Sequence, residues 1–281
     1  MIAHVAAASE LSGRVVLWFD PESICTPEML DAPVRLAAAY DAEIETIVVD
    51  QSADNGGGVP IRNVACRTAS DVPGVEHRFK LLAQRCRRTA ERAGSVRRIQ
   101  VRHAFAQGDA VDRISEMCLA RGPWNIVALA HIPAVGGYSV MGSLLANVSG
   151  ATGFLLCADE PVTKKPRVVV IVEDADRLPS MLRAAERLSE PGNAVHVVLG
   201  AETAAEYAEL EEQTRLLTAD APAVTFASVG PTYGVPGALT DAVARMKPSF
   251  VVARFGGAAL ADGRELSRAS AAMRAPILLV R

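Results

Sequence analysis

The residues with the clearest chemical potential follow two short apolar runs of the sequence. Asp20 directly follows one run, where a carboxylate can contact a ligand or cap the next turn. After the second run comes a glycine-rich stretch that contains Gly136, Gly137 and Gly142, followed by Ser143. Glycines let a backbone approach a ligand closely or simply form a turn, and a serine at a helix start can act as its N-cap. These five residues are the candidate ligand-binding set.

No set of residues points to catalysis or to a metal. His131 follows the second apolar run, but no other histidine lies near it and no H-x3-H spacing occurs. Ser139 lies in Gly-Tyr-Ser-Val-Met, which is not the G-x-S-x-G of a nucleophile elbow. No pair of carboxylates has a spacing that indicates acid–base chemistry. We therefore predict no catalytic residue and no metal ligand, and we expect His131 to be an ordinary loop histidine.

Apolar, β-branched runs alternate along the chain with alanine-rich stretches of helical periodicity. Continuous apolar runs are typical of strands buried on both faces of a parallel sheet. One helix is expected to begin with Thr26 as its N-cap and Pro27 at its first position. Residues 50–73 contain three consecutive glycines and predict a long loop. In the first half, the predicted strands are 15–19, 43–49, 99–105, 126–130 and 154–157, and the predicted helices are 27–40, 75–93, 110–120 and about 143–148.

The pattern of the first half returns in the second. The stretch 14–20, RVVLWFD, is echoed by the stretch 167–173, RVVVIVE, and later positions align without a gap, so that Ser143 falls on Ser267. The repeat predicts an α/β fold of two tandem doubly wound domains. Each domain is expected to be a mainly parallel five-stranded sheet with helices on both faces. The predicted domains are 1–160 and 161–281.

Ligands of doubly wound folds bind beyond the carboxyl ends of the strands, at the point where the strand order reverses. Asp20 and the loop 130–142 should therefore meet at one edge of the first sheet. Their partners in the second half are Glu173 and the stretch 254–266.

The composition fits a pair of ordinary intracellular domains. Half of a 281-residue chain is about 140 residues, enough to bury roughly two-thirds of its unfolded surface without disulfides or metals. The five cysteines are scattered and form no C-x-x-C pair, which indicates reduced thiols. The net charge of -3 does not support nucleic-acid binding, and no uncharged apolar run approaches the length of a membrane span. The expected location is the cytoplasm.

A cluster of arginines occupies residues 78–102, where the only acid is Glu91. Such a stripe can meet an anionic partner. It can also be a solvated helix face whose other side, with Leu82, Cys86 and Ala93, turns to the core. The second interpretation is favoured, because no aromatic residues interleave with the arginines as single-strand binding would require.

The order of these features resembles the universal stress protein family, in a tandem arrangement. The first half has a strand that ends in Asp20, Gly108 and Asp109 before a helix, a fourth strand, Gly142-Ser143, and a closing apolar strand. The second half repeats this outline more loosely. The resemblance covers nearly the whole chain, apart from the loop 50–73 and the segment that joins the halves.

Members of this family that bind ATP carry a G-x2-G-x9-G-[S/T] motif after the fourth strand. Gly142-Ser143 resembles its end, but the two upstream glycines are replaced by Leu129 and Ile132 in this register. In the second half, Leu266 stands before Ser267. The resemblance implies that Asp20 contacts adenine and that ATP or AMP is the candidate ligand of the first half. It implies weakened or altered binding there, with Gly136-Gly137 as a substitute turn, and no binding in the second half.

The family resemblance also implies a function and an arrangement. We expect a stress-response factor that binds a small ligand or acts as a protein scaffold, and not an enzyme. The halves should pair through their last strands, 154–157 and 277–280, as an intrachain pseudo-dimer, and a homodimer is a further candidate state. Two alternatives stay open: a nucleotide-hydrolysing enzyme that uses the first half, and a regulator of a transporter or kinase.

Overall fold

The fold is built on one continuous sheet. The computed structural model describes residues 13–19, 26–50, 75–120, 124–130, 138–158, 167–219, 221, 224–227, 237–260 and 263–281. Within these residues, ten strands follow the order β3-β2-β1-β4-β5-β10-β9-β6-β7-β8. The strands are β1 (Arg14–Phe19), β2 (Glu43–Asp50), β3 (Val101–Gln107), β4 (Asn125–Leu129), β5 (Gly153–Leu156), β6 (Val168–Val172), β7 (Val195–Leu199), β8 (Val224–Phe226), β9 (Phe250–Arg254) and β10 (Ile277–Val280).

The two halves of the sheet have the same strand order. If β6–β10 are numbered from one, both halves read 3-2-1-4-5, and every pairing within a half is parallel. The strand registers also correspond, since Trp18 lies opposite Leu129 and Ile171 lies opposite Ala253. This is the predicted fold class, with two doubly wound five-stranded units in tandem.

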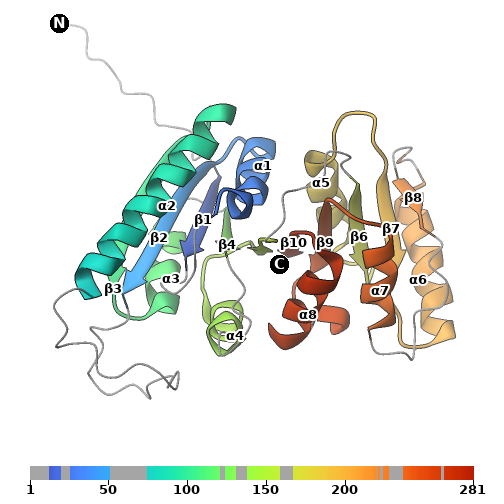
Figure 1. Cartoon of the computed structure of the whole chain (residues 1–281). Coiled ribbons are helices and arrows are strands. Elements are labelled where there is room, and N and C mark those ends of the chain that lie inside the picture. Colours follow the sequence, from blue (N-terminus) through green and yellow to red (C-terminus); the bar gives the residue numbers. More distant parts are fainter. Residues whose placement is uncertain are drawn as a thin grey trace, which may run out of the picture.

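The halves join through their last strands. β5 and β10 pair antiparallel in the middle of the sheet (Figure 1). Gly153 lies opposite Val280, and Leu156 lies opposite Ile277. The first and last positions of one strand thus meet the last and first positions of the other. The pairing is therefore self-complementary. It has the symmetry of a two-fold axis that passes between the two strands.

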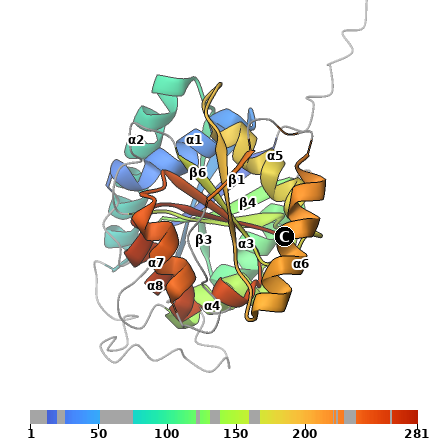
Figure 2. The same ribbon diagram turned by 90° about the vertical axis from the view of Figure 1, so that its right-hand side faces the viewer.

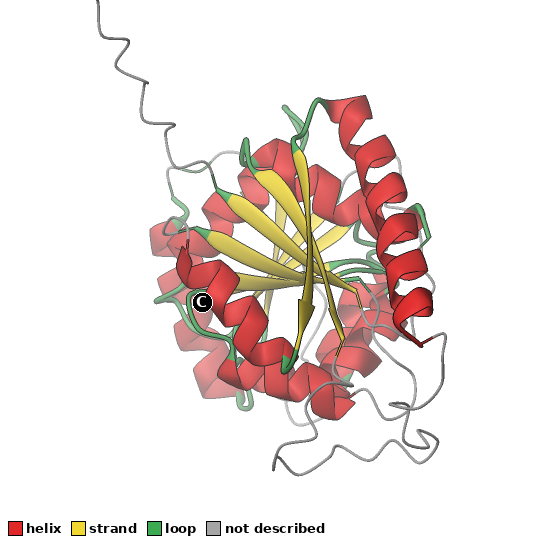
Figure 3. Cartoon of the chain, turned by 90° about the vertical axis from the view of Figure 1, so that its left-hand side faces the viewer, coloured by secondary structure: helices red, strands yellow, loops and turns green. Residues whose placement is uncertain are grey.

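Helices cover both faces of the sheet (Figures 2 and 3). One core lies between the sheet and α1, α2, α5 and α6, and a second core lies between the sheet and α3, α4, α7 and α8. Side chains of β1 alternate between the cores, with Leu17 in the first and Trp18 in the second. The helices are α1 (Asp31–Ala39), α2 (Val75–Arg97), α3 (Ala110–Ala120), α4 (Tyr138–Asn147), α5 (Leu178–Leu188), α6 (Ala204–Leu217), α7 (Ala238–Arg245) and α8 (Gly263–Met273). None of the described helices is long and apolar enough to cross a bilayer.

The prediction for the first helix was wrong at its start. A short 3-10 helix, Glu28–Leu30, comes first and has Pro27 at its N-cap position without a side-chain cap, and α1 begins only at Asp31. The physical reason lies in Pro33, which lacks an N–H and is tolerated only in the first turn of an α-helix. A continuous helix from residue 27 would place this proline in the second turn, where its ring collides with a carbonyl.

Candidate functional site

The carboxyl ends of β1 and β4 lie side by side in the first half. Trp18 pairs with Leu129, and the backbone N–H of Ala130 donates to the Trp18 carbonyl at 3.2 Å. Ala130 is completely buried. These two strand ends are the switch point, because α1 follows β1 onto one face of the sheet and α4 follows β4 onto the other. Asp20, Gly136, Gly137 and His131 lie outside the described residues, and so do the joining segment 159–166 and all of the predicted loop 50–73 after its first residue.

Gly142 and Ser143 lie inside α4 and not at its start. The helix begins at Tyr138, five residues before the predicted first residue. Backbone N–H groups in the second turn bond to carbonyls four residues back, so Ser143 is not the N-cap. Its hydroxyl instead accepts a hydrogen bond from Asn147 Nδ2 at 3.4 Å. The prediction of a helix near 143–148 was therefore wrong in its start, and an anion at the N-terminus of α4 would meet residues around 138.

The surroundings of Gly142 differ from those of the equivalent residue in the second half. No described heavy atom would lie within 4 Å of a Cβ placed on Gly142. The equivalent residue, Leu266, fills the core under α8 and is only 2% exposed. A glycine inside a helix costs about 1 kcal/mol relative to alanine. Among the described residues, no packing contact explains this glycine.

A carboxylate occupies the switch point of the second half. Glu173 directly follows β6, and its side chain reaches the turn after β9. A Cβ on Gly257 would collide with the Glu173 carboxylate, and a Cβ on Gly200 would lie 3.4 Å from Glu173 Cγ. The acidic side chain therefore lies across the ends of three neighbouring strands, at the place where a doubly wound fold binds its ligand.

An ion pair lies beside Glu173 at the same strand ends. Arg254, the last residue of β9, contacts the Asp174 carboxylate, which follows Glu173 beyond β6. The other oxygen of Asp174 accepts hydrogen bonds from the N–H groups of Asp176 at 3.1 Å and Arg177 at 3.4 Å. These strand ends thus hold two carboxylates and one arginine, and the arginine pairs with Asp174. The Glu173 side chain occupies the space over Gly257 that a ligand would need for close approach to the backbone.

The arginine–aspartate bridge is the feature that sequence reasoning missed. The only sequence signal for it was that Glu173 and Asp174 directly follow one predicted strand and that Arg254 ends another. Arg254 stands where the first half has Ala130, so the two switch points differ in charge as well as in shape.

Gly108 and Asp109 have a structural explanation. Gly108 has a φ of +112°, which favours glycine. The Asp109 carboxylate accepts hydrogen bonds from the N–H groups of Val111 at 2.7 Å and Asp112 at 3.2 Å. Asp109 therefore caps α3.

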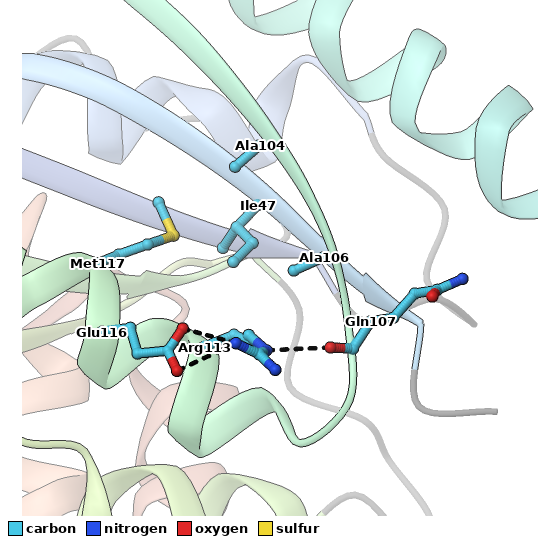
Figure 4. Close-up of a pocket in the computed structure, with 7 residues that line it drawn as sticks. All are labelled: Ile47, Ala104, Ala106, Gln107, Arg113, Glu116 and Met117. Atoms are coloured by element: carbon cyan, nitrogen blue, oxygen red, sulfur yellow. Dashed lines mark hydrogen bonds and ion pairs between the residues drawn. The ribbon is translucent and has the colours of Figure 1, made fainter. Parts of the chain in front are cut away.

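An open groove lies at the edge of the first half, between β2, β3 and α3 (Figure 4). Its volume is about 340 Å³. Arg113 stands at its mouth, donates to the Gln107 carbonyl at 3.0 Å and pairs with Glu116 at 2.7 Å (Figure 4). The groove suits a small apolar group better than a phosphate, because the charge of its arginine is already compensated. It is lined by Ile47, Ala104, Ala106, Gln107, Arg113, Glu116 and Met117.

The described residues offer neither a metal site nor an activated thiol. Among them, no group of three or more histidines, cysteines or acids gathers as metal ligands would. Cys118 is buried and forms no disulfide. Burial raises the pKa of the Cys118 thiol to about 11, which leaves almost no thiolate near neutral pH.

Comparisons with known proteins agree with this fold. No family model matches the chain. No curated protein matches it either. Among solved structures, the chain is similar to a universal stress protein from Archaeoglobus fulgidus DSM 4304, with a TM-score of 0.61 and 14% identity over 96% of both chains. It is also similar to the cytoplasmic domain of a prokaryotic cation chloride cotransporter, with a TM-score of 0.50 and 8% identity over 95% of both chains. At such identities, the likeness shows a shared α/β fold.

Proposed function

We propose that the chain is a tandem protein of the universal stress type that acts as a ligand-responsive scaffold and not as an enzyme. Its two domains, 1–160 and 161–281, form an intrachain pseudo-dimer and work in the cytoplasm. The observation that carries the proposal is the ten-stranded sheet, in which two 3-2-1-4-5 units meet through β5 and β10. Similarity to a universal stress protein over 96% of both chains supports it.

The first half is the proposed binding half, with ATP or AMP as its ligand. Asp20 would contact the adenine, Gly136 and Gly137 would lie along the phosphates just before α4, and Gly142 and Ser143 would approach the ligand from the second turn of α4. The open space beside Gly142 supports this assignment. The loss of two backbone hydrogen bonds to phosphate, relative to a full glycine motif, predicts a dissociation constant of about 0.1 mM.

The second half is the proposed structural half. Glu173 and the Arg254–Asp174 bridge lie where a nucleotide would bind, so their side chains occupy space that an incoming phosphate would need. Its role would be to complete the sheet and to hold the first half in place.

Nucleotide binding can be tested with two acids that follow equivalent strands. Protein purified without added nucleotide is denatured and analysed for released ATP or AMP, and titration calorimetry then measures ATP binding to the native chain. Asp20→Ala should weaken binding about 10-fold or more, while Glu173→Ala should leave it unchanged. Absence of binding at millimolar ATP, or an equal loss in both variants, would contradict the proposed site.

The enzymatic alternative has its own readout. A nucleotide-hydrolysing enzyme would release phosphate from ATP at a rate that Asp20→Ala abolishes. We expect no such turnover above the uncatalysed rate.

A regulator of a transporter is the second candidate function, favoured by the likeness to a transporter's cytoplasmic domain. In that role the chain would bind the cytoplasmic face of a membrane protein. Recovery of one transport protein from detergent-solubilised membranes, in repeated affinity purifications with the chain as bait, would support this role. A set of partners that changes from one purification to the next would count against it.

A further inference from the structure

The two ends of the sheet carry opposite charge. α2 lies at the β3 end of the molecule and α6 lies at the β8 end, and both pack on the same face of the sheet (Figure 1). They are equivalent elements, since each connects the second and third strands of its half. These two equivalent helices thus lie at opposite ends of the sheet.

The described outer face of α2 is basic with an apolar end. Gln84, Arg88, Arg92 and Val96 are all exposed and follow one another at intervals of four residues, so they form one row along the helix. Val96 is 81% exposed. Neither Arg88 nor Arg92 has an ion-pair partner among the described residues. On the inner side, Ala93 packs against the core, as predicted.

The outer face of α6 is acidic with an apolar end. Ala208, Glu212 and Leu216 form a row with the same four-residue spacing, and Leu216 is 72% exposed. Glu209 lies beside the row and is also exposed. The row borders an open groove of about 400 Å³ that Arg215 and Glu211 also line. Arg215 is already paired with Glu211. The face therefore keeps a negative surplus next to exposed leucine.

The two rows match one another. In both helices, a charged side chain is followed one turn later by an exposed apolar residue: Arg92 and then Val96 on α2, Glu212 and then Leu216 on α6. A parallel approach of the helices would bring arginine to glutamate and valine to leucine at once. The apolar stems of arginine can also lie in the α6 groove, with their charged ends at its acidic rim.

We propose that copies of this chain associate head to tail, with α2 of one copy docked on α6 of the next. The contact joins two different surfaces, so a pair of copies still has one free α2 face and one free α6 face. Further copies can therefore add to form an open filament, or the assembly can close into a ring. A second copy is the occupant that the observations favour, because both complementary faces lie on the same molecule. An intramolecular contact is excluded by their positions at opposite ends of the sheet.

The contact should be weak and sensitive to salt. Exposed ion pairs contribute little individually, and the Debye length falls from about 30 Å at 0.01 M salt to about 3 Å at 1 M. We therefore expect the weight-average sedimentation coefficient to rise with protein concentration at about 0.02 M salt. At about 0.5 M salt, the same series should stay at the single-chain value.

Charge reversal on each helix provides the decisive test. The α2 variant carries Arg88→Glu and Arg92→Glu, and the α6 variant carries Glu209→Lys and Glu212→Lys. Each variant alone should associate about 10-fold more weakly than the unchanged chain or not at all. An equimolar mixture should associate again, because the unchanged α2 of one variant meets the unchanged α6 of the other, and the two reversed faces also match.

The matched control reverses two exposed arginines on the opposite face, Arg245→Glu on α7 and Arg268→Glu on α8. It changes the net charge as the α2 variant does, and it should leave association intact. Circular dichroism and thermal melting establish that every variant is folded. A single-chain sedimentation coefficient at all concentrations in low salt would overturn the proposal. So would a variant that associates like the unchanged chain, a mixture no better than its components, or association that disappears after nuclease treatment.

Discussion

At the level of single residues, Gly142 and Gly153 differ in the space that a side chain would find. A Cβ on Gly142 would meet nothing described within 4 Å, whereas a Cβ on Gly153 would lie 2.5 Å from the Leu279 carbonyl across the join between the halves. Gly153 is therefore required for the close approach of β5 and β10. None of the described residues imposes such a requirement on Gly142, so its proposed ligand role can be tested by substitution.

Alanine substitution separates these two roles. Gly142→Ala should raise the melting temperature by about 2 °C, since helix propensity improves without a clash, and should weaken ATP binding. Gly153→Ala should lower the melting temperature, because two strands must move apart. Differential scanning fluorimetry and ATP titration measure both effects. A Gly142→Ala variant that is less stable than the unchanged chain would contradict the open space beside Gly142.

Two histidines make stability depend on pH. Burial lowers the pKa of His103, although Glu91 opposes the shift and Arg87 reinforces it, and burial followed by the charge of Arg167 lowers the pKa of His196. A histidine with a lowered pKa in the folded state binds protons more readily when unfolded. Its contribution is therefore complete above the unfolded pKa of about 6.5 and is lost as pH falls below it.

We predict that the melting temperature falls between pH 7.5 and pH 5.5, and that the double variant His103→Gln/His196→Gln loses less over this interval. The comparison uses the pH dependence and not the absolute stability, because the ring nitrogens also contact Thr46 at 2.7 Å and Thr225 at 3.0 Å. Parallel curves for the two proteins would show that these histidines do not control the acid response.

At the level of elements, a side chain from the second half caps the C-terminal end of α4. The guanidinium of Arg281 donates to the carbonyls of Leu145 and Val148 at 3.0 Å each, near the last turn of α4. It also lies over the rings of Phe154 and Phe255, 4.9 Å and 4.5 Å from their centroids. A cation at the C-terminal end of a helix satisfies its free carbonyls and its dipole.

Removal of this cap should destabilise the whole chain. Arg281→Met keeps an apolar stem but loses the charge-assisted hydrogen bonds, and we expect the free energy of unfolding to fall by about 1–2 kcal/mol. Arg281→Lys should be intermediate, because it retains the charge but not the planar fork. Urea denaturation measures the difference. An unchanged midpoint for Arg281→Met would mean that water replaces the guanidinium without cost.

At the level of the whole molecule, the join between the halves behaves like an interface between two subunits. β5 and β10 pair in a self-complementary register, and α1 with α5 and α4 with α8 pack across it on the two faces. Arg187 of α5 lies over the ring of Tyr40, which follows α1, at 4.7 Å. The contact thus buries strand edges that a separate half would expose.

We therefore predict that residues 161–281, produced alone, form a symmetric dimer through β10. Light scattering should give twice the mass of one chain, and Leu279→Pro should reduce it to a monomer, because proline removes a hydrogen bond of the strand ladder. A stable, folded monomer of the unchanged fragment would show that the exposed edge tolerates solvent.

The sequence by itself determined the type and order of most elements. Continuous apolar runs predicted the central strands, and the repeat between 14–20 and 167–173 predicted the common topology of the halves. These are local or periodic signals, because a strand buried on both faces must be apolar throughout and an amphipathic helix must show its period. The predicted pairing through the last strands followed from the family resemblance and is present in the sheet.

Tertiary structure alone decided the details of the site. The bridge between Arg254 and Asp174 joins residues about eighty positions apart, and Glu173 reaches Gly257 over a similar separation. The start of α4 at Tyr138, before Gly142-Ser143, was also not evident from propensity. Such features depend on which strand ends lie side by side and on which side chains share the space between them. That arrangement is set by long-range packing, and a run of residues carries no local signal for it.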